Sequence, residues 1–343
     1  MSRTTPLLVF ALLLFPRIAA ADDVQVELRD KALAGQGKPA LVLIANKPIT
    51  QAVANLNGPG GKRLALRSGG IGAGQRKELE IDAPTGRSNW RGSLEVHFSD
   101  GTSGSMPLSF SVYVSPGLRL VPPKREDVDT RTGNVRFRIE GGQPSHCDYE
   151  VAFDGKPTRQ GVARFGRDAQ DGAPVTVSWA PHGEDDVVLR IRLVCHDTEG
   201  FYSPTLEVYP WEAPIAHDDV VFDTGKWEIR EEERPKLDAA YEAIAEGIRR
   251  YGKVLEREIK LYIVGHTDTV GDAASNRTLS LRRAEAIARY FRKKGVTIPI
   301  LYTGFGEERP LVPTPDETDE PRNRRAEYII SVEDPIAARW SRL

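Results

Sequence analysis

The spacing of apolar residues changes once along this chain of 343 residues, and the change limits which folds are open to it. Between residues 22 and 210, short runs such as Val24–Leu28 and Val135–Ile139 alternate between apolar and polar side chains. Runs of this kind, separated by turn residues, are typical of β-strands. From residue 231 the apolar residues instead recur at helical spacing. The sequence therefore predicts an all-β part followed by a part that mixes helices and strands.

The all-β part divides in two at a proline-rich boundary. Pro116 and Pro122–Pro123 interrupt the strand pattern, which then resumes. We expect a β-sandwich domain at residues 22–116 and a second, immunoglobulin-like β-sandwich at residues 117–210.

The C-terminal part is expected to begin after a short linker at residues 211–215, with a domain at 216–332 and a tail at 333–343. Ser280 is a candidate N-cap for its second helix. We expect strands at 220–222, 259–264, 300–303 and 326–332, and helices at 231–251 and 281–294. This order, β-α-β-α-β-β, predicts an α/β sandwich with both helices on one face of the sheet.

The N-terminus has the pattern of a secretory signal. Arg3 precedes the apolar run Leu7–Phe15, and the small residues Ala19–Ala21 offer a cleavage site. We expect a signal peptide at residues 1–21 and no transmembrane segment in the mature chain, with an uncleaved membrane anchor as the alternative. The net charge of −2 gives no basic field that would attract nucleic acid.

The chain has two cysteines, Cys147 and Cys195, and an even pair in an exported protein predicts a disulfide. The disulfide could join neighbouring strands or the two sheets of a sandwich. His146 and Asp148 flank the first cysteine, and a histidine and an aspartate also follow the second. Since neither Cys-x-x-Cys nor His-x-x-x-His spacing is present, we expect no metal site and no cofactor.

The most informative polar residues are Asp268 and Arg283, which are 15 positions apart. Asp268 follows the apolar strand at 259–264, at the edge where open α/β sheets commonly hold ligands. A guanidinium binds a carboxylate with two parallel hydrogen bonds, and a carboxylate is a natural partner for an ammonium group. The pair therefore predicts a receptor for a zwitterion. The alternative is that the two side chains simply pair with each other.

Several motifs around this pair resemble the OmpA-like peptidoglycan-binding domain of Gram-negative bacteria, over residues 216–332. They are Val221–Gly225, Gly265–Asp268 with Gly271 and Asn276, Leu279–Ser280, Arg283–Ala284, Gly304–Glu307 with Pro310, and Asn323–Arg325. The motifs occur in the family's order and at matching spacing, which makes the resemblance specific.

The resemblance implies a ligand, the diaminopimelate of the peptidoglycan stem peptide. By position, Asp268 matches the family residue that holds the ammonium group and Arg283 the one that holds the carboxylate. Asn276, Arg324 and Thr224 match residues that contribute further contacts. Two features depart from the family pattern: Gly225 replaces a polar residue, and an acidic insert occupies residues 315–320.

Together these observations predict an exported, non-enzymatic protein of the periplasm that associates with peptidoglycan. The two β domains are expected to bind a partner protein of the cell envelope, and contact with the outer membrane is left open. The alternative is a wall-acting hydrolase anchored by its C-terminal domain, although residues 22–210 show no Ser/His/Asp or Cys/His pattern in a recognisable local context.

Overall fold

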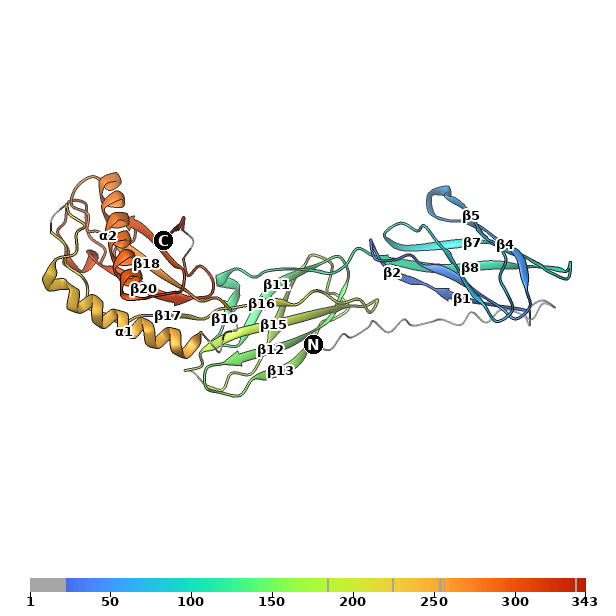
Figure 1. Cartoon of the computed structure of the whole chain (residues 1–343), viewed down its shortest axis with the longest axis horizontal. Helices are drawn as coiled ribbons and strands as arrows, with labels where there is room; N and C mark the ends of the chain where they lie inside the picture. The colour runs from blue at the N-terminus through green and yellow to red at the C-terminus, as the bar shows by residue number, and fades with distance from the viewer. Residues whose placement is uncertain (1–22, 184, 224, 253–254, 256, 337) are drawn as a thin grey trace.

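The computed structural model describes residues 23–343 except 184, 224, 253–254, 256 and 337. The predicted signal peptide and Thr224 therefore lie outside the described residues. The chain is rich in β-structure and forms three bodies in a row, with the second body between the first and the third (Figure 1).

The first body is built from two sheets around one core. Trp90, which is fully buried, belongs to this core together with Leu56 and Leu94. One sheet has the order β1-β3-β6, and the other has the order β2-β8-β7-β4-β5. The elements are β1 Val24–Arg29, β2 Lys31–Leu33, β3 Ala40–Ala45, β4 Ile49–Asn57, η1 Pro59–Gly61, β5 Arg63–Ser68, β6 Arg76–Glu80, β7 Gly86–Phe98 and β8 Ser103–Ser115.

The second body also pairs two sheets. One contains β10-β11-β14 with β9 alongside β11, and the other has the order β13-β12-β15-β16. The elements are β9 Arg119–Val121, η2 Arg125–Asp127, β10 Val128–Asp129, β11 Asn134–Glu140, β12 Pro144–Phe153, β13 Arg159–Arg164, β14 Pro174–Ser178, β15 Val188–Asp197 and β16 Leu206–Val208. The expected disulfide is confirmed: Cys147 and Cys195 are joined across the neighbouring strands β12 and β15.

The third body is a five-stranded sheet, β17-β20-β18-β19-β21, with two long helices. Leu261 and Ile263 of β18 share a buried cluster with both helices, which therefore cover the same face of the sheet. The elements are β17 Glu212–Pro214, η3 Glu231–Glu233, α1 Arg234–Tyr251, β18 Lys260–His266, α2 Ala273–Lys294, β19 Ile300–Gly306, η4 Pro321–Asn323, β20 Ala326–Ser331 and β21 Ser341–Arg342. No helix in the described part of the chain has the length and apolar character needed to span a membrane.

The expected linker at 211–215 is wrong. Trp211 and Ile215 are buried in the core of the third body, and Glu212–Pro214 is strand β17, which pairs with β20. Pro214 is compatible with a strand because β17 lies at the edge of the sheet, where a missing N–H costs no ladder hydrogen bond. The first strand of this sheet is therefore β17, and residues 220–222, expected as a strand, form none.

The expected tail at 333–343 is also part of the folded domain. Ser341–Arg342 forms β21, which pairs with β19. The ring of Trp340 packs edge-on against Tyr262, with centroids 4.8 Å apart. The Tyr262 hydroxyl donates a hydrogen bond of 2.8 Å to Asp334. The C-terminal segment thus covers the face of the sheet opposite the helices.

The second helix starts earlier than expected. Helix α2 begins at Ala273, and its N-cap is Asp272, whose carboxylate accepts a hydrogen bond from the Ser275 N–H. Ser280 lies in the interior of the helix and is fully buried, so its assignment as N-cap was wrong.

The contacts between the bodies differ in kind. The first and second bodies meet through Glu199, whose carboxylate pairs with Lys31 at 3.3 Å and with Arg87 at 2.5 Å. The rings of Tyr113 and Phe201 also meet at this junction, with centroids 5.9 Å apart. The second and third bodies share apolar packing, because Leu189 of β15 and Tyr209 belong to the same buried cluster as helices α1 and α2.

Candidate functional site

Glycines at the carboxyl ends of two strands allow helix α2 to approach the sheet closely. A Cβ at Gly265 would lie within 3.0 Å of the Ser280 carbonyl, and one at Gly304 would meet the backbone of Leu281. The Ser280 hydroxyl accepts a hydrogen bond of 2.9 Å from the Gly306 N–H. This contact fixes the height of α2 above the sheet and so positions Arg283, which is three residues further along the helix.

The loop after β18 is held by the side chain of Asn276. Its amide nitrogen donates to the Glu307 carboxylate at 2.7 Å, to the Val270 carbonyl at 3.1 Å and to the Asp268 carbonyl at 3.4 Å. Asn276 is buried, and these bonds satisfy its amide group. It therefore holds Asp268 and the turn after β19 in place.

The Asp268 carboxylate pairs with Arg324. The Arg324 Nη1 lies 2.5 Å from Asp268 Oδ2, and the same Nη1 also pairs with Asp319. The two carboxylates raise the pKa of Arg324. Within the described residues, Asp268 therefore forms its ion pair with Arg324. It does not pair with Arg283, which was the alternative that the sequence left open.

The Arg283 guanidinium is buried and held by backbone carbonyls. Its Nε donates to the Lys226 carbonyl at 3.0 Å and its Nη2 to the Asp223 carbonyl at 3.3 Å. Its charge lies 5.0 Å from the centre of the Phe222 ring. Burial lowers the pKa of Arg283, the negative charge of Asp268 counteracts this effect, and Arg324 adds to it. No described carboxylate forms an ion pair with it.

A recess of about 130 Å³ opens beside Arg283 and Arg324, and Asp268 and Asn276 are not part of its lining. Its polar lining comes from Arg283, Arg324, Arg325, His266 and Asp219. Its apolar lining comes from Val220, Val221, Phe222, Gly265, Pro321 and Ala326. The segment expected as a strand at 220–222 thus forms a wall of the recess.

His266 and Arg325 support the rim of the recess. His266 is buried, and the Glu327 carboxylate lies 3.4 Å from its Nε2. Burial lowers the pKa of His266, Arg325 and Arg309 add to this effect, and Glu327 opposes it. Arg325 donates from Nε and Nη2 to the same Glu327 oxygen, at 3.0 and 2.6 Å.

The acidic insert at 315–320 packs against the loop after β18. The Thr269 hydroxyl donates to the Pro315 carbonyl at 2.8 Å and accepts from the Thr318 N–H at 3.0 Å. The Thr269 carbonyl accepts from the Glu317 N–H at 2.9 Å. These bonds bring Asp319 within reach of Arg324, so the insert adds one carboxylate to the site.

The structure brings four of the five predicted site residues together, namely Asp268, Arg283, Asn276 and Arg324. Thr224 lies outside the described residues; its neighbour Gly225 has a φ of 69°, which favours glycine. Asp219 stands in none of the recognised motifs, and Asp319 was noted only as part of the acidic insert at 315–320. The backbone carbonyls that hold Arg283 could not be read from residue types at all.

These features gather charged side chains around a recess at the carboxyl edge of the sheet, where open α/β sheets commonly hold ligands. Residues 221–324 match the family model described as OmpA family, so this part of the chain is an OmpA-family domain.

Known relatives match only part of this chain. Outer membrane protein P5 of Haemophilus influenzae is 33% identical over 109 residues, which are 32% of this chain and 27% of that protein. The photosystem I P700 chlorophyll a apoprotein A2 of Gloeobacter violaceus is 34% identical over 123 residues, 34% of this chain and 13% of that protein. Among solved structures, the peptidoglycan-associated lipoprotein of Burkholderia pseudomallei aligns at 24% identity and a TM-score of 0.27, over 33% of this chain and 88% of that one. The chain thus spans well under half the length of the two sequence relatives.

Proposed function

We propose that the C-terminal domain binds the diaminopimelate of peptidoglycan and holds this protein on the cell wall. Arg283 takes the ligand's carboxylate, and Asp268 takes its ammonium group. The proposal rests on the family match and above all on one observation: the buried Arg283 guanidinium faces the recess without a carboxylate partner among the described residues.

A buried charge is costly unless it is paired, so Arg283 is a site prepared for an anion. Guanidinium has five N–H donors. The Lys226 and Asp223 carbonyls take one donor from Nε and one from Nη2. The Nη1–Nη2 edge is left for a carboxylate, which it binds with two parallel hydrogen bonds.

The charges around Asp268 suit an ammonium group. Asp268 and Asp319 share the single cation Arg324, which leaves one negative charge in this half of the site. A carboxylate offers about four lone-pair positions, so Asp268 can accept from a ligand ammonium beside Arg324. When Arg283 is included, the formal charges of the four side chains sum to zero, which matches the net charge of a zwitterion.

The remaining predicted contacts have different roles in this proposal. Arg324 lines the recess and orients Asp268, while Asn276 acts through the loop that carries Asp268. We also assign Thr224 to the site, on the resemblance alone.

The test is co-sedimentation with insoluble peptidoglycan. We expect the full chain to pellet with sacculi that contain diaminopimelate, and to pellet poorly with peptidoglycan in which lysine replaces it, because lysine lacks the second carboxylate. Truncating one partner of a buried charge pair costs about 2–5 kcal/mol, so Arg283→Ala and Asp268→Ala should each weaken binding roughly 30-fold or more.

Arg283→Lys keeps the charge and removes the two-pronged donor, so it should also bind weakly. Arg282→Ala is the matched control: Arg282 is the preceding residue of α2, is exposed and stacks on Trp227 away from the recess lining. Equal pelleting of the Arg283, Asp268 and Arg282 variants would overturn the assignment.

We further propose that the protein acts without catalysis, in the periplasm, with its two β domains binding an envelope partner. Both cysteines are joined in the disulfide, so neither offers a thiolate nucleophile. The β domains contribute no residue to the recess, which leaves their surfaces for a separate role. Release of soluble muropeptides from sacculi by the purified chain would favour the hydrolase instead.

A further inference from the structure

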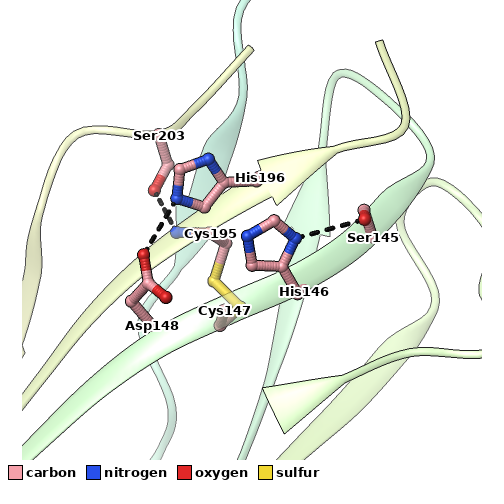
Figure 2. The surroundings of a disulfide bond; sticks show 7 residues. All are labelled: Ser145, His146, Cys147, Asp148, Cys195, His196 and Ser203. Carbon is pink, nitrogen blue, oxygen red and sulfur yellow. Dashed lines mark hydrogen bonds and ion pairs between the residues drawn. A yellow bond between two sulfur atoms is a disulfide. The ribbon is translucent and has the colours of Figure 1, made fainter. Parts of the chain in front are cut away.

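Two histidines and an aspartate gather beside the disulfide of the second body. His146 on β12 lies directly opposite His196 on β15, and their rings stack with centroids 4.4 Å apart and planes 2° from parallel. Asp148, two residues beyond His146, points to the same place (Figure 2). One ring nitrogen of each histidine and one Asp148 oxygen all lie within 4.8 Å of one another.

We propose that His146, His196 and Asp148 form a binding site for a divalent transition-metal cation, with Zn²⁺ as its representative. Two imidazoles and one carboxylate are a donor set that Zn²⁺ commonly uses when further positions stay open to water. The set is borderline in softness, so it suits Zn²⁺ better than Mg²⁺ or Ca²⁺, which prefer oxygen ligands alone.

The spacing of two of the ligands already fits a bound cation. His196 Nε2 and Asp148 Oδ2 are 3.1 Å apart. A tetrahedral Zn²⁺ at about 2.0–2.1 Å from two ligands holds them roughly 3.3 Å from each other. Metal binding there replaces the proton between the two groups, and the His146 ring must turn out of its stack with His196 to direct its lone pair at the same cation.

The orientation of His146 favours ligation. Its Nδ1 lies 3.2 Å from the Ser145 hydroxyl, which engages that nitrogen and leaves Nε2 as the ligand atom.

The disulfide holds the strands that carry the ligands. Cys147 and Cys195 are paired in register immediately beside the two histidines. The cysteines are fully buried in the core, whereas the His196 and Asp148 side chains are 26% and 54% exposed. Side chains alternate between the two faces of a strand, so the ligands lie on the outer face of the sheet, where a cation can reach them.

The test is calorimetric titration of the untagged full chain with Zn²⁺ after treatment with a chelator. We expect one equivalent to bind to the wild-type chain. Outer-shell changes around metal sites cost 10- to 100-fold in affinity, so loss of a ligand in His146→Ala or His196→Ala should cost at least about 10-fold. Asp148→Asn keeps the shape of the side chain and should weaken binding as well.

The matched control is His97→Ala, which removes an exposed strand histidine from the first body and should leave the titration unchanged. Zn²⁺ should also raise the thermal midpoint of the wild-type chain and of the control, but not of the three ligand variants, which reports binding to the folded state. The proposal is wrong if the wild-type chain does not bind one equivalent of Zn²⁺, or if the ligand variants bind Zn²⁺ as tightly as the His97 variant does.

Discussion

The close approach of α2 to the sheet makes Gly265 a position where one added methyl group should lower the stability of the domain. In Gly265→Ala the new Cβ would lie within 3.0 Å of the Ser280 carbonyl, whereas an unstrained contact between heavy atoms is roughly 3.5 Å. The obstacle is backbone, which cannot rotate away as a side chain could. Helix α2 must therefore move outward by at least about 0.5 Å.

Two effects follow from this movement. Overpacking of a buried contact typically costs about 1–3 kcal/mol, which for a domain of this size lowers the thermal midpoint by roughly 4–15 °C. The displacement also carries Arg283 away from the Lys226 and Asp223 carbonyls that hold it. Affinity for peptidoglycan should therefore fall at temperatures where the variant is still folded.

Scanning calorimetry and co-sedimentation of the same preparation separate the two effects. Gly37→Ala is the control, because a Cβ at Gly37 would meet no atom within 4 Å. It should change the free energy of unfolding by less than about 0.5 kcal/mol. A Gly265→Ala protein that unfolds at the same temperature as the control and binds normally would refute the claim that this contact sets the helix height.

Two further predictions concern the contacts that hold other parts of the fold. Glu233 is buried at the start of α1 and accepts hydrogen bonds from the Val221 N–H and from Lys236. Burial raises the pKa of Glu233, but the interactions with Lys236, Val221 and Arg230 outweigh burial and lower the pKa. Stability from Glu233 should therefore be present at neutral pH and lost as the pH falls below its ordinary value of 4.5, and urea unfolding of Glu233→Gln should show a flatter dependence between pH 3 and 7. Glu199→Gln should weaken the junction of the first two bodies without unfolding either, and small-angle scattering should then show a broader range of molecular lengths. The control Glu140→Gln removes an ion pair to Arg119 inside the second body and should leave that range unchanged. An identical scattering curve for both variants would contradict this role of Glu199.

Elements with apolar periodicity were predictable, and elements with polar buried residues were not. Leu237 and Ile244 are buried on α1 as their spacing indicates. Helix α2 starts eight residues before the predicted position because its early buried residues are Asn276, Ser280 and Arg283. A search for apolar spacing cannot detect a face made of polar side chains.

The edges of the C-terminal sheet were missed for a different reason. Strands β17 and β21 have three and two residues, too few to show alternation. They are strands because β20 and β19 offer unpaired backbone groups beside them. The proline in β17 made that segment resemble a linker, and the charged residue in β21 made that segment resemble a tail.

The site was predictable as a set of residues and not as a set of contacts. Motif spacing brought Asp268, Arg283, Asn276 and Arg324 together, but the pairing of Asp268 with Arg324 depends on where the chain returns after the acidic insert. The sequence shows a histidine beside each cysteine, but a search for local metal motifs treats each segment alone and gives no reason to bring the two together. In antiparallel strands with Cys147 opposite Cys195, residue 146 must face residue 196, so the assumption of a cross-strand disulfide would have placed them together.

The unequal junctions between the bodies have a mechanical consequence. Leu189 and Tyr209 pack into the same apolar cluster as the C-terminal helices, whereas the first body is attached through the partly buried Glu199 with its two cations and through the contact between the Tyr113 and Phe201 rings. A chain held on the wall by its last domain and pulled through its first would transmit tension across the apolar junction and yield at the ionic one. High salt, which screens charges but not apolar contacts, would lower the force needed to part the first body from the other two.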